Sequence, residues 1–223
     1  MKIVGILGGL GPSTTAKLYL DILNDKKYSK YPNVLISNVS FLKGLDEDII
    51  KNKKSINNME VPLKESLEQL KKAGANIFVL PCNTLEDLVD RIKKDMKINL
   101  LTPIGEVVRK ISGMNIKKLG IIATSKTKEL KLYENRLKNV EIIYPSKENQ
   151  KEVSNIISRI IKNNTEDKDK YFLIKIINEF KSLRCDKVVL GCTDLSNLLS
   201  ESSFVVDSFS VLSKKVKIIL SNN

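Results

Sequence analysis

Short apolar runs of strand length alternate with amphipathic segments of helix length along almost the whole chain. The runs at residues 2–7, 77–80 and 187–190 are nearly continuous in apolar side chains, which is typical of parallel strands buried on both faces. Between such runs, apolar residues recur every three or four positions, as on helices that pack against a sheet. This alternation predicts an α/β protein built from parallel sheets.

The limits of the expected elements follow from these two periods and from the Gly and Pro residues between them. Pro12 lies in a first helical turn and Gly74 follows a last one, as is common at helix ends. Residues 40–58, rich in Lys, Asp and Asn, are expected to form a loop. The predicted strands are 2–7, 34–39, 77–80, 98–101, 118–124, 140–144, 187–190 and 204–206. The predicted helices are 12–24, 61–73, 85–94, 104–111, 129–137, 148–162, 169–183 and 210–219.

The pattern starts again in the second half of the chain. Residues 118–124 resemble residues 3–9 in character, and each segment is followed, at nearly the same separation, by a strand that ends at a cysteine. Landmarks that recur at a similar offset indicate a duplicated βαβ unit. We therefore expect two pseudo-symmetric, doubly wound parallel-sheet lobes with the active site in the cleft between them. The predicted lobes are 1–102 with 207–223, and 103–206.

Cys82 and Cys192 are the strongest candidates for chemistry. Each follows a predicted buried strand and precedes a helical pattern, so each thiol is expected at the carboxyl end of a sheet, where α/β proteins bind ligands. A helix N-terminus would lower the thiol pKa and favour the reactive thiolate. If the lobes face each other, the two thiols lie across one cleft. The third cysteine, Cys185, is interpreted as a small buried residue.

The net charge of +12 raises the question of nucleic-acid binding. The excess is almost entirely lysine, dispersed along the chain without interleaved aromatic residues or a nucleic-acid module. Lysines on solvated helix faces explain it, and such a surface would attract small dianionic substrates. No apolar run reaches the roughly 20 residues that span a bilayer. Three cysteines without CxxC spacing argue against a disulfide framework. These features predict a cytoplasmic protein without nucleic-acid or membrane partners.

Several short motifs resemble, in order, those of the aspartate/glutamate racemase family, and most closely its aspartate racemase branch. They are GILGGLGP at residues 5–12, PCNT at 81–84, AT at 123–124, LGCTDL at 190–195 and VDS at 206–208. The resemblance implies an isomerase that inverts an amino acid α-carbon with two cysteines and no pyridoxal phosphate, metal or other cofactor. It also implies aspartate or glutamate as the substrate, and a homodimer.

The resemblance assigns roles to residues beside the cysteines. Two identical groups, one a thiol and the other a thiolate, suit an inversion that must run in both directions, and such a pair titrates as one coupled unit. The basic residue Lys162 matches, by its distance from Cys192, a position that holds the side-chain carboxylate, and Lys43, Lys53 or Lys54 would replace an expected arginine. The implied site residues are Cys82 and Cys192 for catalysis and Gly9, Leu10, Gly11, Lys43, Asn83, Thr84, Thr124, Lys162 and Thr193 for substrate binding.

The chain departs from the family pattern at three positions. It contains no histidine, and Glu86 stands where the family commonly has one. Asp194 replaces a usual glutamate, and Lys126 replaces a glycine. Glu86 and Asp194 can also be read as acids that complement a helix dipole, and Lys162 as a solvated lysine. The alternatives are a related diacid decarboxylase or isomerase, and a non-catalytic amino acid binding protein on the same scaffold.

Overall fold

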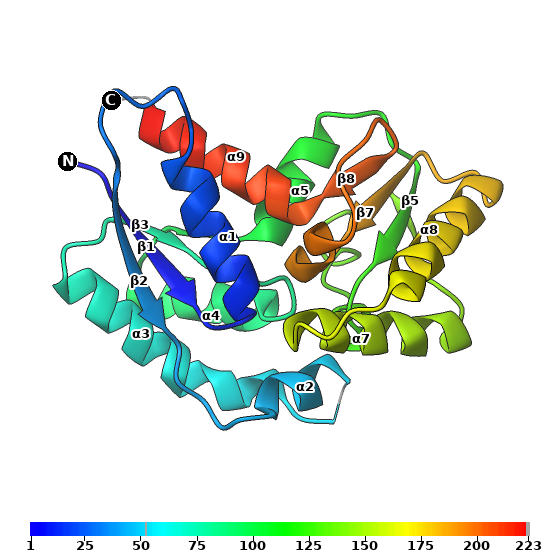
Figure 1. Ribbon diagram of the computed structural model, residues 1–223, viewed down its shortest axis with the longest axis horizontal. Helices are drawn as coiled ribbons and strands as arrows, with labels where there is room; N and C mark the ends of the chain where they lie inside the picture. Colours follow the sequence, from blue (N-terminus) through cyan, green and yellow to red (C-terminus); the bar gives the residue numbers. More distant parts are fainter. Residues whose placement is uncertain (52, 222–223) are drawn as a thin grey trace.

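The computed structural model describes residues 1–51 and 53–221, and within them it forms two four-stranded sheets, one in each lobe (Figure 1). Every strand pair is parallel. The first sheet has the order β2 (Asn33–Asn38), β1 (Ile3–Gly8), β3 (Ile77–Val79), β4 (Leu100–Leu101). The second repeats that order with β6 (Glu141–Ile143), β5 (Lys118–Ile122), β7 (Lys187–Leu190), β8 (Val205–Asp207). The prediction of two pseudo-symmetric parallel-sheet lobes is confirmed.

Helices cover both sheets and connect the lobes (Figure 1). None of the described helices is long and apolar enough to cross a bilayer. The last helix, α9, places Leu212 and Val216 in the core of the first lobe and Val211 in the core of the second, so the predicted lobe boundaries stay a prediction. The helical elements are α1 (Pro12–Leu23), α2 (Leu45–Ile50), η1 (Ile56–Met59), α3 (Glu60–Lys72), α4 (Glu86–Met96), α5 (Pro103–Ser112), α6 (Ser125–Glu129), α7 (Lys147–Ile161), α8 (Asp167–Ser182), η2 (Thr193–Asn197) and α9 (Ser208–Ser221).

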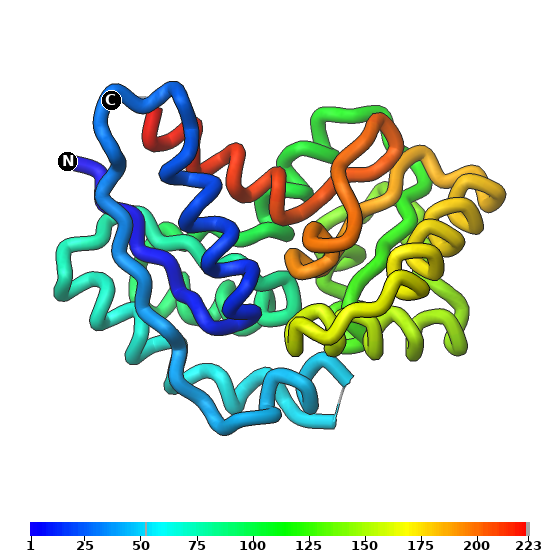
Figure 2. Tube along the Cα trace, in the orientation of Figure 1, coloured from blue at the N-terminus to red at the C-terminus, as the bar shows by residue number. Residues whose placement is uncertain are grey.

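Residues 40–58 were expected to be a loop, but they contain α2 and the 3₁₀ turn η1. Six residues are too few to show a helical period in the sequence. The segment is held by tertiary contacts instead, because Ile49 and Ile50 are buried. Helix α2 leaves the first lobe and packs against α6 and α7 of the second (Figure 2). It therefore bridges the lobes across the carboxyl ends of the strands.

The predicted helix at 129–137 is wrong in position, because α6 occupies residues 125–129 and turns follow it. Its start is fixed by Thr124, whose side chain accepts a hydrogen bond from the backbone N–H of Thr127. Soon after its end, Lys131 adopts a left-handed conformation that interrupts the helix. The segment after Cys192 is likewise the 3₁₀ helix η2 and not an α-helix. Both differences lie next to the predicted site.

Gly120, in the middle of β5, faces the ring of Phe180 on α8. A Cβ added at Gly120 would lie 2.5 Å from a ring carbon of Phe180, which is almost completely buried. We expect Gly120→Ala to lower the free energy of unfolding by about 1–3 kcal/mol, the usual cost of overpacking. Urea denaturation tests this, with Gly113→Ala as the control, since the nearest atom there is 3.6 Å away. Equal losses in the two variants would contradict the argument.

Candidate active site

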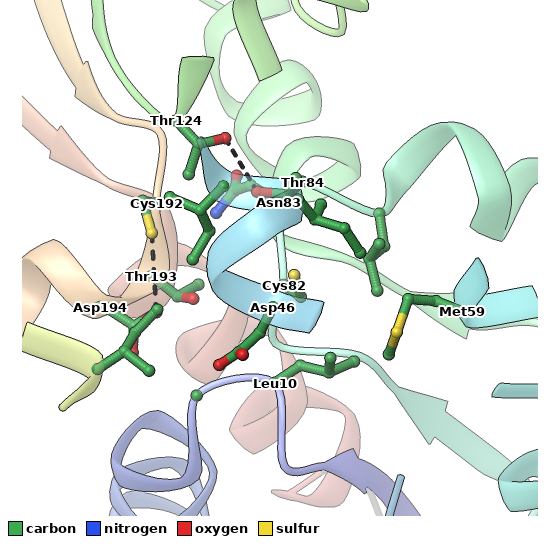
Figure 3. Close-up of a pocket in the computed structure, with 15 residues that line it drawn as sticks. Leu10, Asp46, Met59, Cys82, Asn83, Thr84, Thr124, Cys192, Thr193 and Asp194 are labelled. Carbon is green, nitrogen blue, oxygen red and sulfur yellow. Dashed lines mark hydrogen bonds between the residues drawn. The ribbon is translucent and has the colours of Figure 1, made fainter. Parts of the chain in front are cut away.

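A pocket opens between the lobes, beyond the carboxyl ends of β3 and β7 (Figure 3). Most of the site residues expected from the sequence line it: Leu10, Gly11, Cys82, Asn83, Thr84, Thr124, Cys192 and Thr193. The remaining wall was not expected: Asp46, Ile49, Ile50, Met59, Leu85, Ile161 and Asp194. Three of these seven residues come from α2, whose existence the sequence did not reveal.

The two candidate catalytic cysteines come from equivalent places in the two lobes. Cys82 follows β3 and is half-buried, and Cys192 follows β7 and is buried. The Cys192 thiol donates a hydrogen bond to the Asp194 carboxylate, with 3.7 Å between Sγ and Oδ2 (Figure 3). One pocket therefore holds a thiol from each lobe, as a reaction on opposite faces of one carbon would need.

Burial, and not the helix ends, dominates the acidity of these thiols. Burial raises the pKa of Cys82 to about 12, although backbone N–H groups of Leu85 and Thr84 act in the opposite direction. Burial also raises the pKa of Cys192 well above its usual value, and the charge of Asp194 adds to the effect. The expectation of lowered thiol pKa values is therefore wrong for the ligand-free site, because losing hydration costs the thiolate more than these N–H groups return.

This acidity predicts a distinctive pH dependence of alkylation. With a pKa near 12, the thiolate fraction of Cys82 at pH 7 is very small and grows about tenfold per pH unit. The rate at which iodoacetamide modifies Cys82, followed by site-resolved mass spectrometry, should therefore rise about tenfold per unit from pH 7 to beyond 10. The thiol of glutathione serves as the reference, since an ordinary thiol levels off above its pKa of about 8.5. A rate at Cys82 that is flat between pH 7 and 9 would show that the thiolate already exists.

The side chain of Asn83 is held from two directions. Its carbonyl oxygen accepts a hydrogen bond of 3.1 Å from the Tyr133 hydroxyl, and its amide nitrogen donates one of 3.1 Å to the Ser208 hydroxyl. Tyr133 is completely buried and lies in the turns after α6. Sequence reasoning missed Tyr133, since it expected a plain helix there. The two partners fix the orientation of the Asn83 amide.

Hydroxyl groups connect the remaining polar wall. The hydroxyls of Thr84 and Thr124 are 3.1 Å apart (Figure 3). The hydroxyl of Thr124 is also 3.0 Å from that of Thr127. Thr193 donates a hydrogen bond of 2.9 Å to the carbonyl oxygen of Pro81. These contacts join the segment around Cys82 to the second lobe, so the polar side chains beside the two thiols are held in place before a ligand arrives.

The glycine-rich turn after β1 closes the pocket next to Asp194. Gly11 has a left-handed backbone (φ 67°), and a Cβ there would collide with the Asp194 carboxylate. Asp194 also accepts a hydrogen bond of 2.5 Å from the Thr14 hydroxyl, and burial raises its pKa. Gly9 does not line the pocket, and its N–H donates a hydrogen bond of 3.2 Å to the Thr15 hydroxyl. Only glycine at position 11 allows the turn to approach this carboxylate.

The basic residues expected to hold a side-chain carboxylate lie outside the pocket wall. Lys162 is exposed, and its ammonium pairs with Glu47 of α2 at 2.5 Å. Lys43, Lys53 and Lys54 are exposed and do not contribute to the wall either. Among the residues that the structure describes, no lysine or arginine lines this pocket.

Two of the three departures from the family pattern also lie outside the pocket. Glu86 is almost completely buried, accepts a hydrogen bond of 2.9 Å from Thr102 and lies 3.7 Å from Arg136. Burial raises the pKa of Glu86. Lys126 is buried and pairs with Glu129 on α6 at 3.2 Å. No group of three or more Cys, Asp or Glu side chains in the described part of the chain could hold a metal ion. The expected independence from cofactors stays a prediction.

Comparison with known proteins agrees with this geometry. A family model described as Asp/Glu/Hydantoin racemase matches residues 7–216. The broad specificity amino-acid racemase RacX of Bacillus subtilis (strain 168) is 24% identical over 224 residues, 95% of each chain.

Two solved structures share the fold. An aspartate racemase homologue from Pyrococcus horikoshii OT3 is 23% identical, with a TM-score of 0.78 over 100% of both chains. The aspartate racemase of Picrophilus torridus is 21% identical, with a TM-score of 0.79 over 99% of this chain and 94% of the other. Because the family match extends over most of the sequence, the resemblance inferred from the motifs is confirmed. The chain belongs to the Asp/Glu/Hydantoin racemase family.

Proposed function

We propose that this protein is a cofactor-independent amino acid racemase in which Cys82 and Cys192 exchange the α-proton of the substrate. The observation that carries the proposal is the pair of thiols, one from each lobe, in the wall of a single pocket. Family membership supports a racemase, and the hydrogen-bond donors of Asn83 and Thr84 beside Cys82 support a substrate with an α-carboxylate.

The proton balance of the reaction needs both thiols. One cysteine, as the thiolate, removes the α-proton from one face, and the electron pair left on the α-carbon is delocalised into the carboxylate. The other cysteine, as the neutral thiol, donates its proton to the opposite face and becomes the thiolate. The enzyme is then ready for the opposite enantiomer, and nothing is oxidised or reduced. General acid–base steps of this kind typically contribute about 10²–10⁴-fold in rate each.

The environment of the thiols supports this role. A thiolate whose pKa is raised by burial is a stronger base towards a carbon acid than an ordinary thiolate, although it is less populated. A bound amino acid brings an ammonium group that can offset the cost of forming it. The hydroxyl of Thr84 and the second N–H of the Asn83 amide are available for the charge that develops on the carboxylate.

The resemblance predicts aspartate or glutamate as the substrate, a homodimer and a cytoplasmic location, and these form the finer part of the proposal. In this reading, Lys162 would have to exchange Glu47 for the side-chain carboxylate of the substrate. Lys43 would have to approach from the exposed segment before α2. The charges of the side chains that line the pocket bear on whether the substrate carries a second carboxylate.

The test is to incubate the purified protein, without pyridoxal phosphate and with EDTA, with L- and D-aspartate, glutamate and a panel of other amino acids in D₂O. We expect both enantiomers to appear by chiral chromatography, with deuterium at the α-carbon by NMR. Release of carbon dioxide without inversion would indicate the decarboxylase alternative instead. Binding without any α-deuterium in any amino acid would indicate the non-catalytic one.

A further inference from the structure

We infer that the pocket selects an amino acid whose side chain has an aliphatic stem and a terminal positive charge, as in lysine, ornithine and arginine, with Asp46 as the group that binds the charge. The inference rests on the proposed function and names its substrate class.

Asp46 is the first indication. It lies in the first turn of α2, and its carboxylate is directed into the pocket, towards the loop that carries Leu10 (Figure 3). It is half-buried and has no hydrogen-bond or ion-pair partner among the residues that the structure describes. The two acids that follow it have other surroundings, because Glu47 pairs with Lys51 and Lys162 and Asp48 does not line the pocket. An unpaired carboxylate in a ligand pocket is complementary to a cation.

The apolar part of the wall is the second indication. Ile49 and Ile50 from α2, Met59 from η1 and Ile161 from α7 line the pocket together with Leu10. Such side chains make favourable contacts with methylene groups and offer nothing to a short carboxylate side chain. An aliphatic stem that leads to a terminal cation satisfies the apolar wall and Asp46 together.

The charge balance is the third indication. The wall contains the carboxylates of Asp46 and Asp194 and no cationic side chain among the described residues. The catalytic step adds a thiolate to this set, and the charge of Asp194 already raises the pKa of both cysteines. A substrate with a second carboxylate would increase the repulsion, whereas a second ammonium or a guanidinium would reduce it. The thiolate therefore forms more readily beside a cationic substrate.

The competing arrangement moves Lys162 into the pocket to meet a substrate carboxylate. Its ammonium would first have to leave Glu47, to which it donates a hydrogen bond of 2.5 Å. The bonds from Lys162 and Lys51 lower the pKa of Glu47 to about 2, so this carboxylate stays charged and attractive to Lys162 at neutral pH. Release would also remove an ion pair that links α2 to the residue after α7.

The experiment compares L-lysine, L-norleucine and L-aspartate, because norleucine has the four-carbon stem of lysine without its ammonium. For the wild-type protein we expect kcat/KM for lysine to exceed that for either other substrate by about tenfold or more. Asp46→Asn should reduce the ratio of kcat/KM for lysine to kcat/KM for norleucine to about one. Asp48→Asn, on the same helix but outside the pocket, is the matched control and should preserve the lysine preference.

The dissociation constants of the three amino acids, measured by calorimetry on the same variants, separate the two levels of the proposal. Selective lysine binding that depends on Asp46, without racemisation of any of them, would support this inference and overturn the proposed function. Racemisation of aspartate in preference to lysine would leave the proposed function intact and overturn the inference, all the more if Lys162→Ala abolished it. Failure of all three to bind, or a lysine preference that survives Asp46→Asn, would overturn it too.

Discussion

Replacing either Cys82 or Cys192 by serine is expected to lower kcat for net racemisation by about 10²–10⁴-fold or more. A hydroxyl is far less acidic than a thiol, so the variant lacks an effective acid in one direction and an effective base in the other. The remaining thiol can still remove and return a proton on its own face. Each variant should therefore exchange the α-proton of one enantiomer with solvent, and the two variants should prefer opposite enantiomers.

Proton NMR of each single variant with each enantiomer in D₂O measures this directly. The control is Cys185→Ser, because Cys185 lies in the apolar core of the second lobe and does not line the pocket. It should keep near wild-type racemisation, apart from any loss of stability. Interconversion at close to the wild-type rate in either Cys82→Ser or Cys192→Ser would rule out the two-base mechanism.

The fold was predictable because both periods of the pattern are strong in this chain. Buried parallel strands such as β1 and β7 are short, continuous apolar runs, and Gly74 terminates the helix before β3. The duplication fixed the two-lobe arrangement. Prediction failed in the two segments where the sequence has no helical or strand period. Helix α2 has only six residues, too few to show one. The turns after α6 place Tyr133 in the core through tertiary contacts alone.

Site residues at the ends of strands could be predicted from the sequence. The partners of long, flexible side chains could not. Cys82, Asn83 and Thr193 reach the pocket because parallel strands present their carboxyl ends at one edge. The position of Lys162, directly after α7, was compatible with a contact to substrate, yet its side chain pairs with Glu47 outside the pocket. Separation along the chain cannot tell which of two acids, one in the protein and one in the ligand, a lysine will bind.

The acidity of the thiols is a second quantity that sequence could not supply. A cysteine before a helical pattern suggests a lowered pKa, but the sign depends on how much water the fold leaves at the sulfur. Here the loss of hydration at the Cys82 thiol outweighs the effect of the N–H groups of Thr84 and Leu85. Asp194 then acts in the same direction as burial, which makes this carboxylate the residue whose removal is most informative.

Asp194→Asn is expected to have opposite effects on catalysis and on thiol reactivity. The carboxylate accepts the hydrogen bond of the Cys192 thiol and faces the pocket, where it can attract the substrate ammonium, so kcat/KM should fall on the order of 100-fold. Its charge raises the pKa of both thiols, so its removal must lower both values and increase the thiolate fraction at a given pH. Alkylation of Cys82 and Cys192 at pH 8 should therefore become faster while racemisation becomes slower.

Thr14 provides a matched pair of controls for this prediction. Its hydroxyl donates the 2.5 Å hydrogen bond to Asp194, and the residue is completely buried. Thr14→Val removes the donor at nearly constant volume but keeps the carboxylate, so it should slow racemisation without the faster alkylation, whereas Thr14→Ser should restore activity. If Asp194→Asn slowed alkylation as well as catalysis, its effect would be a general disturbance of the pocket. The electrostatic role of Asp194 would then be wrong, because removing a negative charge cannot by itself raise a thiol pKa.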